Sequence, residues 1–340
     1  MLPVNVFGLP EGTLPHAFLP NPVTIVRPPR NRAGAPHRPH GRPRGPVRLA
    51  ARLAALAALA VGLLSAPPAA AAEVGTRMVS GLSWRSGASA EDSFGAWRGR
   101  PLDVRVVFVR RYSWDQLREG LRGARFRDQC QDAPLCVVSL AMFPGLAAGQ
   151  FRQCAGGSFD ADHRETAGLI AAAQRGSLVR LGWEANLGGD AHPWSIRRAS
   201  DIGPYKDCFG RLARIHKAAG LKIEWTNSKG QMFPYMEAYP GDDVVDVWGL
   251  HQYDNDTRGI QFADYVAAAA RRGKKVGVGE WGLRTNGDNP EYVRRMYDQF
   301  RAKASDLAYE SYFNRRSEHM LHPSTRYPQA ARAYRELWGR

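Results

Sequence analysis

The sequence predicts an α/β protein folded as a single (β/α)8 (TIM) barrel over residues 73–340. From Glu73 onward, eight short apolar runs alternate with longer amphipathic runs. Most of the short runs are rich in Val, Leu and aromatic residues with few polar breaks, which is typical of strands buried on both faces of a parallel sheet. Eight strand–helix units in about 268 residues fit this barrel, whose usual length is about 250 residues.

The apolar runs define the candidate strands in chain order. The first four are MVSGLSW (78–84), LDVRVVFV (102–109), LCVVSLAM (135–142) and LVRLGWE (178–184). The last four are LKIEWTN (221–227), VVDVWGLHQY (244–253), KVGVGEWG (275–282) and LAYESYFN (307–314). A doubly wound open sheet is the competing architecture, but the Gly-x-Gly-x-x-Gly loop that it would favour does not follow residues 78–84.

Helix-like stretches lie between the strands, among them 161–175, 206–219, 261–272 and 290–304. Pro290 suits a first helical turn, and Asn289 before it is a candidate N-cap. No internal repeat and no second domain is evident. A monomer is the working expectation, although the sequence gives no view of oligomeric state.

Two segments precede the predicted barrel. Residues 1–45 are crowded with Pro and Arg and lack a hydrophobic period, so they cannot build a core. Residues 46–72 have a basic flank, an apolar stretch of about 14 residues and small residues ending at Ala72, the pattern of a secretory signal peptide. A membrane anchor is the weaker alternative, because a spanning helix needs roughly 20 apolar residues. Since the basic region of a signal peptide is brief, we expect translation to start near Val47 and the protein to be secreted.

The net charge does not indicate a nucleic-acid partner. Of the formal +15, residues 1–72 contribute +7 through eight Arg and one acid, which leaves +8 for the predicted barrel. A nucleic-acid surface would show a clustered basic stripe. The nearest cluster, at 271–275, is expected to be a solvated turn before a strand. We therefore expect neither a nucleic-acid partner nor a stable membrane association.

Four cysteines fall in the predicted barrel, and in an exported protein an even number indicates disulfides. Cys130 and Cys136 flank the entry into the third strand at one face of the barrel. Cys154 follows that strand and Cys208 follows the fourth, which places both at the opposite face. Because the Cα atoms of a disulfide lie roughly 4.4–6.8 Å apart, pairing across the barrel is excluded. We expect Cys130–Cys136 and Cys154–Cys208, and no motif indicates a metal or another cofactor.

Two glutamates end predicted strands, and strand ends are where barrel enzymes carry their chemistry. Glu184 ends the fourth strand and Glu280 ends the seventh, each beside a Trp and small residues. Two carboxylates at one barrel mouth suit acid/base and nucleophilic work on a glycosidic bond. Glu224 and Glu310 lie inside strands and are interpreted as structural residues.

The segments RLGWEAN (180–186) and GEWG (279–282) resemble the two catalytic signatures of glycoside hydrolase family 26. Strand order agrees with that family from about residue 78 to the C-terminus. In the family pattern an Arg precedes the acid/base Glu by four residues and an Asn follows it by two, as Arg180 and Asn186 do. A Tyr after the sixth strand, matched by Tyr253, bonds the nucleophile.

The resemblance implies Glu184 as the proton donor and general base, and Glu280 as the nucleophile. Burial against Trp183 should favour the acid form of Glu184 by desolvation. Trp183 is also a departure, since β-mannanases of the family carry His at that position, and this weakens the assignment of mannan more than that of glycosidase chemistry. The family's Trp-rich loop is reduced here to His-Pro-Trp at 192–194.

Further residues near strand ends are candidates for substrate binding. Tryptophans could stack on sugar rings, and polar groups could bond hydroxyls. The full set of candidates is Trp84, Arg180, Trp183, Asn186, Trp194, His251, Tyr253 and Trp281.

The predicted function is a secreted, metal-independent, retaining endo-β-glycosidase that acts on a β-linked polysaccharide. β-1,4-Mannan is the leading substrate and β-1,3-1,4-glucan the alternative. Two other classes stay open: a non-catalytic polysaccharide-binding barrel, and a different hydrolase such as an esterase. The latter lacks a Gly-x-Ser-x-Gly nucleophile motif.

Overall fold

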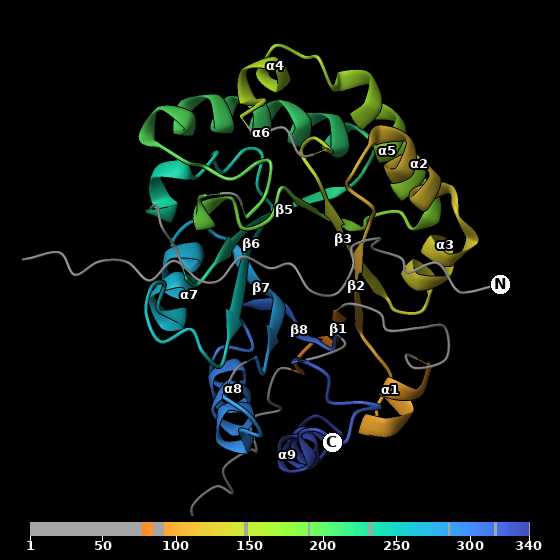
Figure 1. Cartoon of the computed structure of the whole chain (residues 1–340), viewed down its shortest axis with the longest axis vertical. Helices are drawn as coiled ribbons and strands as arrows, with labels where there is room; N and C mark the ends of the chain where they lie inside the picture. The colour runs from red at the N-terminus through yellow and green to blue at the C-terminus, as the bar shows by residue number, and fades with distance from the viewer. Residues whose placement is uncertain are drawn as a thin grey trace, which may run out of the picture. The chain divides into compact units, whose positions relative to one another are not determined.

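The computed structural model describes residues 77–83, 92–145, 149–189, 191–230, 234–284, 286–315 and 318–339. Within this part of the chain, eight parallel strands close into a barrel in chain order, which confirms the predicted (β/α)8 fold (Figure 1). The strands are β1 (Ser80–Ser83), β2 (Val104–Phe108), β3 (Leu135–Leu140), β4 (Leu178–Leu181), β5 (Lys222–Ser228), β6 (Val247–Tyr253), β7 (Lys275–Gly282) and β8 (Leu307–Phe313).

Helices surround the strands, as Figure 1 shows. Within the described ranges they are α1 (Asp92–Arg98), α2 (Trp114–Arg122), α3 (Ala124–Gln131), α4 (Phe151–Ala155), α5 (Asp160–Ala173), α6 (Ile202–Ala218), α7 (Phe262–Ala270), α8 (Pro290–Ala302) and α9 (Pro328–Trp338). As predicted, α8 begins with Pro290 and is capped by the Asn289 side chain, which accepts from the backbone N–H of Tyr292 at 3.0 Å. None of the helices described combines the length and hydropathy needed to cross a bilayer.

β4 is shorter than predicted, because the chain leaves extended geometry at its end. The strand stops at Leu181, and the predicted continuation to Glu184 is wrong. Gly182 and Glu184 have φ of 54° and 58°, in the left-handed region, so neither can extend a strand. A short 3-10 turn, η1 (Ala185–Leu187), follows at once.

The barrel interior is apolar at the strand starts and polar toward the strand ends. Val104, Val106, Val137, Leu178 and Tyr309 form one buried apolar cluster. Further along the strands, Arg180 on β4 and Glu224 on β5 contact each other, and both are polar and fully buried. The second level of the barrel is therefore a polar layer directly below the strand ends.

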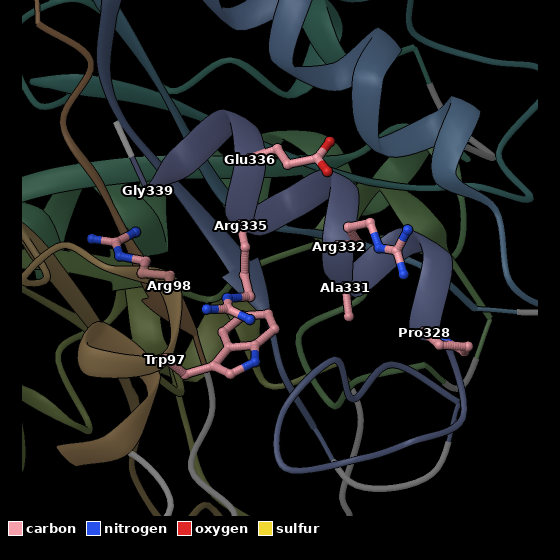
Figure 2. Close-up of a pocket in the computed structure, with 8 residues that line it drawn as sticks. All are labelled: Trp97, Arg98, Pro328, Ala331, Arg332, Arg335, Glu336 and Gly339. Atoms are coloured by element: carbon pink, nitrogen blue, oxygen red, sulfur yellow. The ribbon is translucent and has the colours of Figure 1, made fainter.

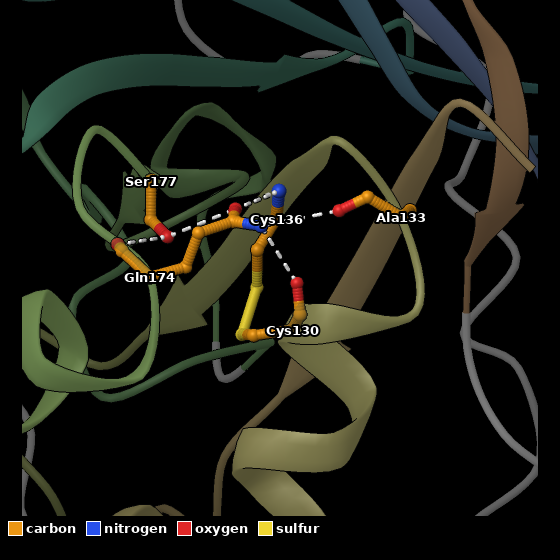
Figure 3. Close-up of a disulfide and its surroundings, with 5 residues drawn as sticks. All are labelled: Cys130, Ala133, Cys136, Gln174 and Ser177. Atoms are coloured by element: carbon orange, nitrogen blue, oxygen red, sulfur yellow. Dashed lines mark hydrogen bonds between the residues drawn. A yellow bond between two sulfur atoms is a disulfide. The ribbon is translucent and has the colours of Figure 1, made fainter.

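Both predicted disulfides are present. Cys130–Cys136 joins α3 to the start of β3 with a Cα separation of 4.9 Å, and Cys154–Cys208 joins α4 to α6 with a separation of 5.1 Å. Gln174, after α5, clamps the first of them (Figure 3). Its Nε2 donates to the carbonyl of Cys130 at 2.9 Å, and its Oε1 accepts from the Cys136 backbone at 2.8 Å.

Several sequence predictions concern residues outside the described part of the chain. These are the Pro/Arg-rich segment 1–45, the signal segment 46–72 and the stacking candidate Trp84. All described residues belong to the compact unit that spans 70–340.

Candidate active site

Glu184 and Glu280 meet at the carboxyl ends of the barrel strands. The Nδ1 atom of His251, at the end of β6, lies 3.0 Å from Oε1 of Glu184 and 3.3 Å from Oε1 of Glu280. These two oxygens can therefore be no further apart than the sum of the two distances. Contact of both carboxylates with one nitrogen atom is compatible with the roughly 5–5.5 Å between the carboxyl groups of retaining glycosidases.

A β-bulge in β7 turns Glu280 into the barrel. Gly249 of β6 pairs with Gly277, but His251, two residues on, pairs with Glu280, three residues on. β7 therefore carries one extra residue at this point. Strict alternation from Gly277 would have pointed Glu280 toward the helices and Trp281 into the barrel. The bulge reverses the two.

Three groups from β4 and β6 surround the Glu280 carboxylate. Tyr253 donates its hydroxyl to Oε2 at 2.7 Å, and Arg180 donates to Oε1 at 2.9 Å. His251 faces the same Oε1. Burial, reinforced by the charges of Glu280 and Glu184, raises the pKa of the Tyr253 phenol well above its ordinary value, so this hydroxyl keeps its proton and donates.

Arg180 is itself fixed by a buried polar layer. Its Nε lies 3.3 Å from Oε1 of Glu224, and neither side chain is exposed. Thr226 and Tyr309 each donate a hydroxyl to Glu224 at 2.6 Å. Burial disfavours the charge on Arg180, but Tyr309, Glu224 and Glu280 outweigh it and raise the guanidinium pKa. The network keeps a cation beside Glu280, and it shows Glu224 in the structural role expected for it.

Three glycines make room for this layer. A Cβ at Gly279 would collide with the guanidinium of Arg180, and one at Gly249 would collide with Thr226 and Glu224. At Gly277 it would meet Tyr309 and Glu224. The polar layer therefore requires that these positions have no side chain.

Glu184 has an unusual backbone. Its φ of 58° and ψ of 30° make it the one non-glycine residue with positive φ in the described ranges. Such a conformation costs of order 1–3 kcal/mol and persists only where the surroundings enforce it. Here the Glu184 N–H donates to the carbonyl of Thr226 at 2.9 Å. The next turn is fixed by Asn186, whose amide exchanges two hydrogen bonds of 2.8 Å with the Ser228 backbone.

Two histidines face the carboxyl group of Glu184. His251 contacts Oε1, and His192 Nε2 lies 3.4 Å from Oε2. Burial acts to raise the pKa of this carboxyl, but the hydrogen bonds and electrostatic interactions with His192 and His251 outweigh burial and hold it below its ordinary value. Burial does favour the acid form of Glu184 as expected, but the two histidines reverse the net direction, and no local pattern in the sequence indicates His192 beside this carboxyl.

Aromatic side chains surround the carboxylates. The Trp183 ring packs edge-on against Phe108 with centroids 5.7 Å apart, and Phe108 contacts Phe313 at 6.1 Å. Phe313 in turn packs against Tyr253 with ring centroids 6.0 Å apart, and the Tyr253 ring lies 5.1 Å from that of His319. These contacts run from β2 and β4 through β8 to β6, so they form an aromatic wall around the site.

Several predicted binding residues do not face the site with free groups. Trp281 is fully buried between the barrel and α9, stacked on Trp338 and bonded to Glu310 at 2.5 Å. Trp194 is also fully buried and donates to the carbonyl of Trp183 at 2.8 Å. Stacking of either indole on a sugar is therefore excluded in this conformation, and those two predictions are corrected.

One polar candidate is also corrected, and another stays a prediction. The amide of Asn186 is engaged by the backbone of β5 and is 1% exposed, so it shapes the loop rather than offering itself to a sugar hydroxyl. His251 is fully buried with its Nδ1 in contact with both carboxylates, and its predicted bond to a sugar hydroxyl stays a prediction. Arg180, Tyr253 and Trp183 do lie beside Glu184 or Glu280.

Sequence reasoning missed Arg111 and His192. Arg111 lies just past the end of β2, and its guanidinium contacts His192 Nδ1 at 2.8 Å. Its position after a predicted strand could have identified it. His192 belongs to the His-Pro-Trp segment, which was considered only for its indole.

A hollow lies between α1 and α9 on the outside of the barrel (Figure 2). It has a volume of about 660 Å³ and contains Trp97, Arg332, Arg335 and Glu336. Arg335 lies over the Trp97 ring at 5.9 Å. A single carboxylate among arginines does not suit glycosidic chemistry, so we place the candidate active site at the strand ends. In the described residues no group of three His, Cys, Asp or Glu side chains is arranged to hold a metal ion.

Comparisons with known proteins show the fold. No family model and no curated protein matches the chain. A Bacillus subtilis mannanase, BCman, is 15% identical with a TM-score of 0.59, over 78% of this chain and 87% of that one. A modular endo-β-1,4-mannanase of glycoside hydrolase family 26 from Cellulomonas fimi is 19% identical with a TM-score of 0.51, over 72% of this chain and 67% of that one. A family 26 β-mannanase from Bacteroides ovatus is 15% identical with a TM-score of 0.50, over 76% of this chain and 85% of that one. Family 26 β-mannanases thus recur among the structural neighbours, and the predicted resemblance is confirmed at the level of the fold.

Proposed function

We propose that this protein is a secreted retaining endo-β-glycosidase of the family 26 type, with β-1,4-mannan as its first candidate substrate. The observation that carries the proposal is the single Nδ1 atom of His251 in contact with both Glu184 and Glu280. Two carboxylates so close at one barrel mouth fit the double-displacement mechanism. The mannanases among the structural neighbours support the same class of substrate.

The two carboxylates would divide the reaction into two steps. Glu280 attacks the anomeric carbon while Glu184 gives its proton to the glycosidic oxygen, so that the bond to the leaving sugar breaks and a glycosyl ester forms on Glu280. Glu184 then takes a proton from water, whose oxygen attacks the same carbon and releases Glu280. Both inversions together retain the configuration, and Glu184 ends protonated as it began.

Glu184 must be protonated before the first step, although the two histidines favour its ionised form. A sugar bound between the carboxylates would exclude water from Glu184 and strengthen the desolvation that favours the neutral acid. The contacts of Glu280 support the opposite role, because Arg180 and Tyr253 stabilise a carboxylate that must carry negative charge to attack.

The proposal of secretion is supported by the two disulfides, which persist in oxidising compartments. It is tested by N-terminal sequencing of the exported protein, which should begin near Glu73. A retained N-terminus upstream of Ala54 would contradict it.

The catalytic assignment is tested by reducing-sugar release from β-mannan, mixed-linkage β-glucan and a panel of other β-glycans. Glu184→Ala and Glu280→Ala should each lose at least about a thousandfold in rate, and Glu119→Ala should not. Glu119 is a suitable control because its side chain is 73% exposed and makes only a 3.4 Å surface ion pair with Arg110 among the described contacts. NMR of the first product should show the β-anomer.

Added azide gives a sharper separation of the roles. With an activated aryl glycoside, azide should restore turnover to Glu184→Ala by forming a β-glycosyl azide, because the vacated space lies on the face where water attacks. Activity that survives both substitutions would contradict the site. Glycan binding without release would favour a non-catalytic barrel, and preference for mixed-linkage glucan would replace mannan as the substrate.

A further inference from the structure

The loop after β4 holds His192 in a rigid turn. The His192 N–H donates to Oγ of Ser195 at 3.0 Å, and the Ser195 N–H donates back to the His192 carbonyl at 3.0 Å. The carbonyl of Ala185 accepts from the Ile196 N–H at 2.9 Å, which ties the end of the turn to the residue after Glu184. The imidazole therefore has a fixed place beside the carboxyl group.

Arg111 determines which nitrogen of His192 carries the proton. A guanidinium can only donate, and Arg111 contacts Nδ1 at 2.8 Å, so Nδ1 acts as the acceptor. The proton of the neutral ring is then on Nε2, the atom that lies 3.4 Å from Oε2 of Glu184. A chain of donors thus runs from Arg111 through His192 to Glu184.

Two indoles keep this chain aligned. The His192 ring stacks on Trp194 with centroids 4.9 Å apart and an interplanar angle of 10°. Arg111 lies over both Trp183 and Trp194, at 5.7 and 5.8 Å from the ring centroids. Cation–π contact of this kind orients a guanidinium. The buried Trp194, unable to stack on a sugar, has this supporting role instead.

We propose that Arg111 and His192 are a positioning pair that sets the orientation and the protonation of Glu184. The proposal rests on the proposed role of Glu184 as proton donor and base. His192 donates to the carboxylate and so favours the form that takes a proton from water in the second step. Trp183 occupies the position where family 26 mannanases carry His, and the loop after β4 supplies a histidine from another place in the chain.

Other charged groups near Glu184 remain in place when His192 is changed. His251 contacts the second oxygen, Arg111 acts on it through space, and the charge of Glu184 is felt at Tyr253 and Asp256. Of the contacts to the Glu184 carboxyl, substitution at 192 removes only that of His192, and it also removes the contact of Arg111 with Nδ1. A change in the titration of Glu184 would therefore report that contact.

The test does not require activity. The intact protein is labelled with 13C at the Glu carboxyl carbons, and the Glu184 signal is identified by its loss in Glu184→Gln. In the wild type this carboxyl should titrate below the ordinary range of Glu. His192→Phe keeps a ring to stack on Trp194 but has no N–H, and should raise the midpoint by about one pH unit, the effect of one lost bond to a charged group.

Two further variants distinguish positioning from general disturbance. His192→Gln retains a non-titrating N–H donor near the place of Nε2 and should restore most of the wild-type midpoint. His322→Phe is the matched control. His322 also stacks on an indole, that of Trp97, with ring centroids 5.0 Å apart and an interplanar angle of 17°. Trp97 lies on α1, outside the barrel. This control variant should leave the midpoint unchanged.

Arg111 is tested by a double-mutant cycle. Arg111→Met should raise the midpoint more in the wild type than in His192→Phe, because part of its effect passes through the imidazole. Equal shifts in both backgrounds would show that Arg111 acts by charge alone and would overturn the pair. An unchanged midpoint in folded His192→Phe would overturn the proposal for His192.

Kinetics separate this proposal from the proposed function. If the protein is a glycosidase, the alkaline limb of kcat/KM should move to higher pH in His192→Phe. The loss of kcat/KM in this variant should be smaller on an aryl glycoside, whose leaving group needs no proton, than on a glycan. If no glycan is cleaved but the Glu184 midpoint still shifts, the pair stands and the assigned reaction fails. If glycans are cleaved and neither midpoint nor limb shifts, the pair fails and the reaction stands.

Discussion

Glu184 holds φ of 58°, a backbone angle that residues with a side chain seldom adopt. The carbonyl of Thr226 and the loop fixed by Asn186 hold it there. The strain directs the carboxyl group toward His251 and Glu280, so stability and activity make opposing demands on one residue.

A glycine at this position should relieve the strain at the expense of the chemistry. We expect Glu184→Gly to be about 1 kcal/mol more stable than Glu184→Ala, since glycine alone enters the left-handed region without steric cost. Urea unfolding of the two inactive variants gives the comparison. Equal stabilities would show that the backbone relaxes when the carboxyl group is removed.

Gly279 tests the polar layer at the same scale. Gly279→Ala should lower activity by at least tenfold and destabilise the barrel by about 1–3 kcal/mol, because the methyl group would displace the guanidinium of Arg180 from Glu280. Assay and denaturation of the purified variant measure both effects. Gly168→Ala on α5 is the control: nothing lies within 4 Å of its added Cβ, so it should be neutral or slightly stabilising. Full activity in Gly279→Ala would contradict the role of Arg180.

At the scale of elements, a buried histidine pair joins α5 to α6. His163 donates from Nε2 to the carbonyl of Met142 at 2.8 Å, so its Nδ1 accepts from Nε2 of His216 at 3.0 Å. Both rings are fully buried. A proton added to His163 would set two N–H groups against each other. Burial lowers the pKa of His163 to about 4 and that of His216 well below its ordinary value.

The pair should make stability depend on pH. The unfolded histidines bind protons below about pH 6.5 while the folded ones do not, so stability is full above that pH and falls as pH drops toward 4. His163 alone should account for about 3 kcal/mol of this loss. Urea unfolding between pH 4.5 and 7.5 should show a shallower slope in the double variant His163→Gln/His216→Gln than in the wild type. Parallel slopes would contradict the prediction, whatever the stability of the variant.

The strand ends show what periodicity can and cannot predict. The eight apolar runs located all eight strands, because strands buried on both faces differ in composition from their surroundings. The bulge in β7 left no such signal. Counting alternate residues from Gly277 turns Glu280 outward, and only pairing with β6 reveals the extra residue. Glu280 and Trp281 are adjacent on β7 and therefore point to opposite faces, so both could not line the site as predicted.

At the scale of the molecule, topology predicted contacts that local pattern could not. The order of strands and helices determined which cysteines share a face, and both disulfides followed from it. The carboxylate pair followed likewise from the strand ends. Arg111 and His192 could not be paired in advance, because 81 residues separate them and their contact depends on loop conformation. Side-chain contacts between loops that are distant in the chain could not be predicted from the sequence.

The two disulfides should contribute unequally to stability. The Cys154–Cys208 bridge spans 54 residues and Cys130–Cys136 spans six. By loop entropy, losing the first should cost about 4 kcal/mol and losing the second about 2 kcal/mol. Denaturation of the paired Cys→Ser variants, each lacking one bridge, measures the difference. A larger loss from the short bridge would show that the clamp by Gln174 depends on it.

The glycines at 249, 277 and 279 bear on redesign of the protein. Since any side chain there meets the packed groups around Arg180 and Glu224, the floor below the carboxylates cannot be reshaped by point substitution. The segments that follow β2 and β4 are restricted as well, because they carry Arg111, Glu184 and His192. Under the proposed function, an engineer who seeks activity on another glycan should keep the floor and these three residues, and diversify the remaining positions of the rim loops.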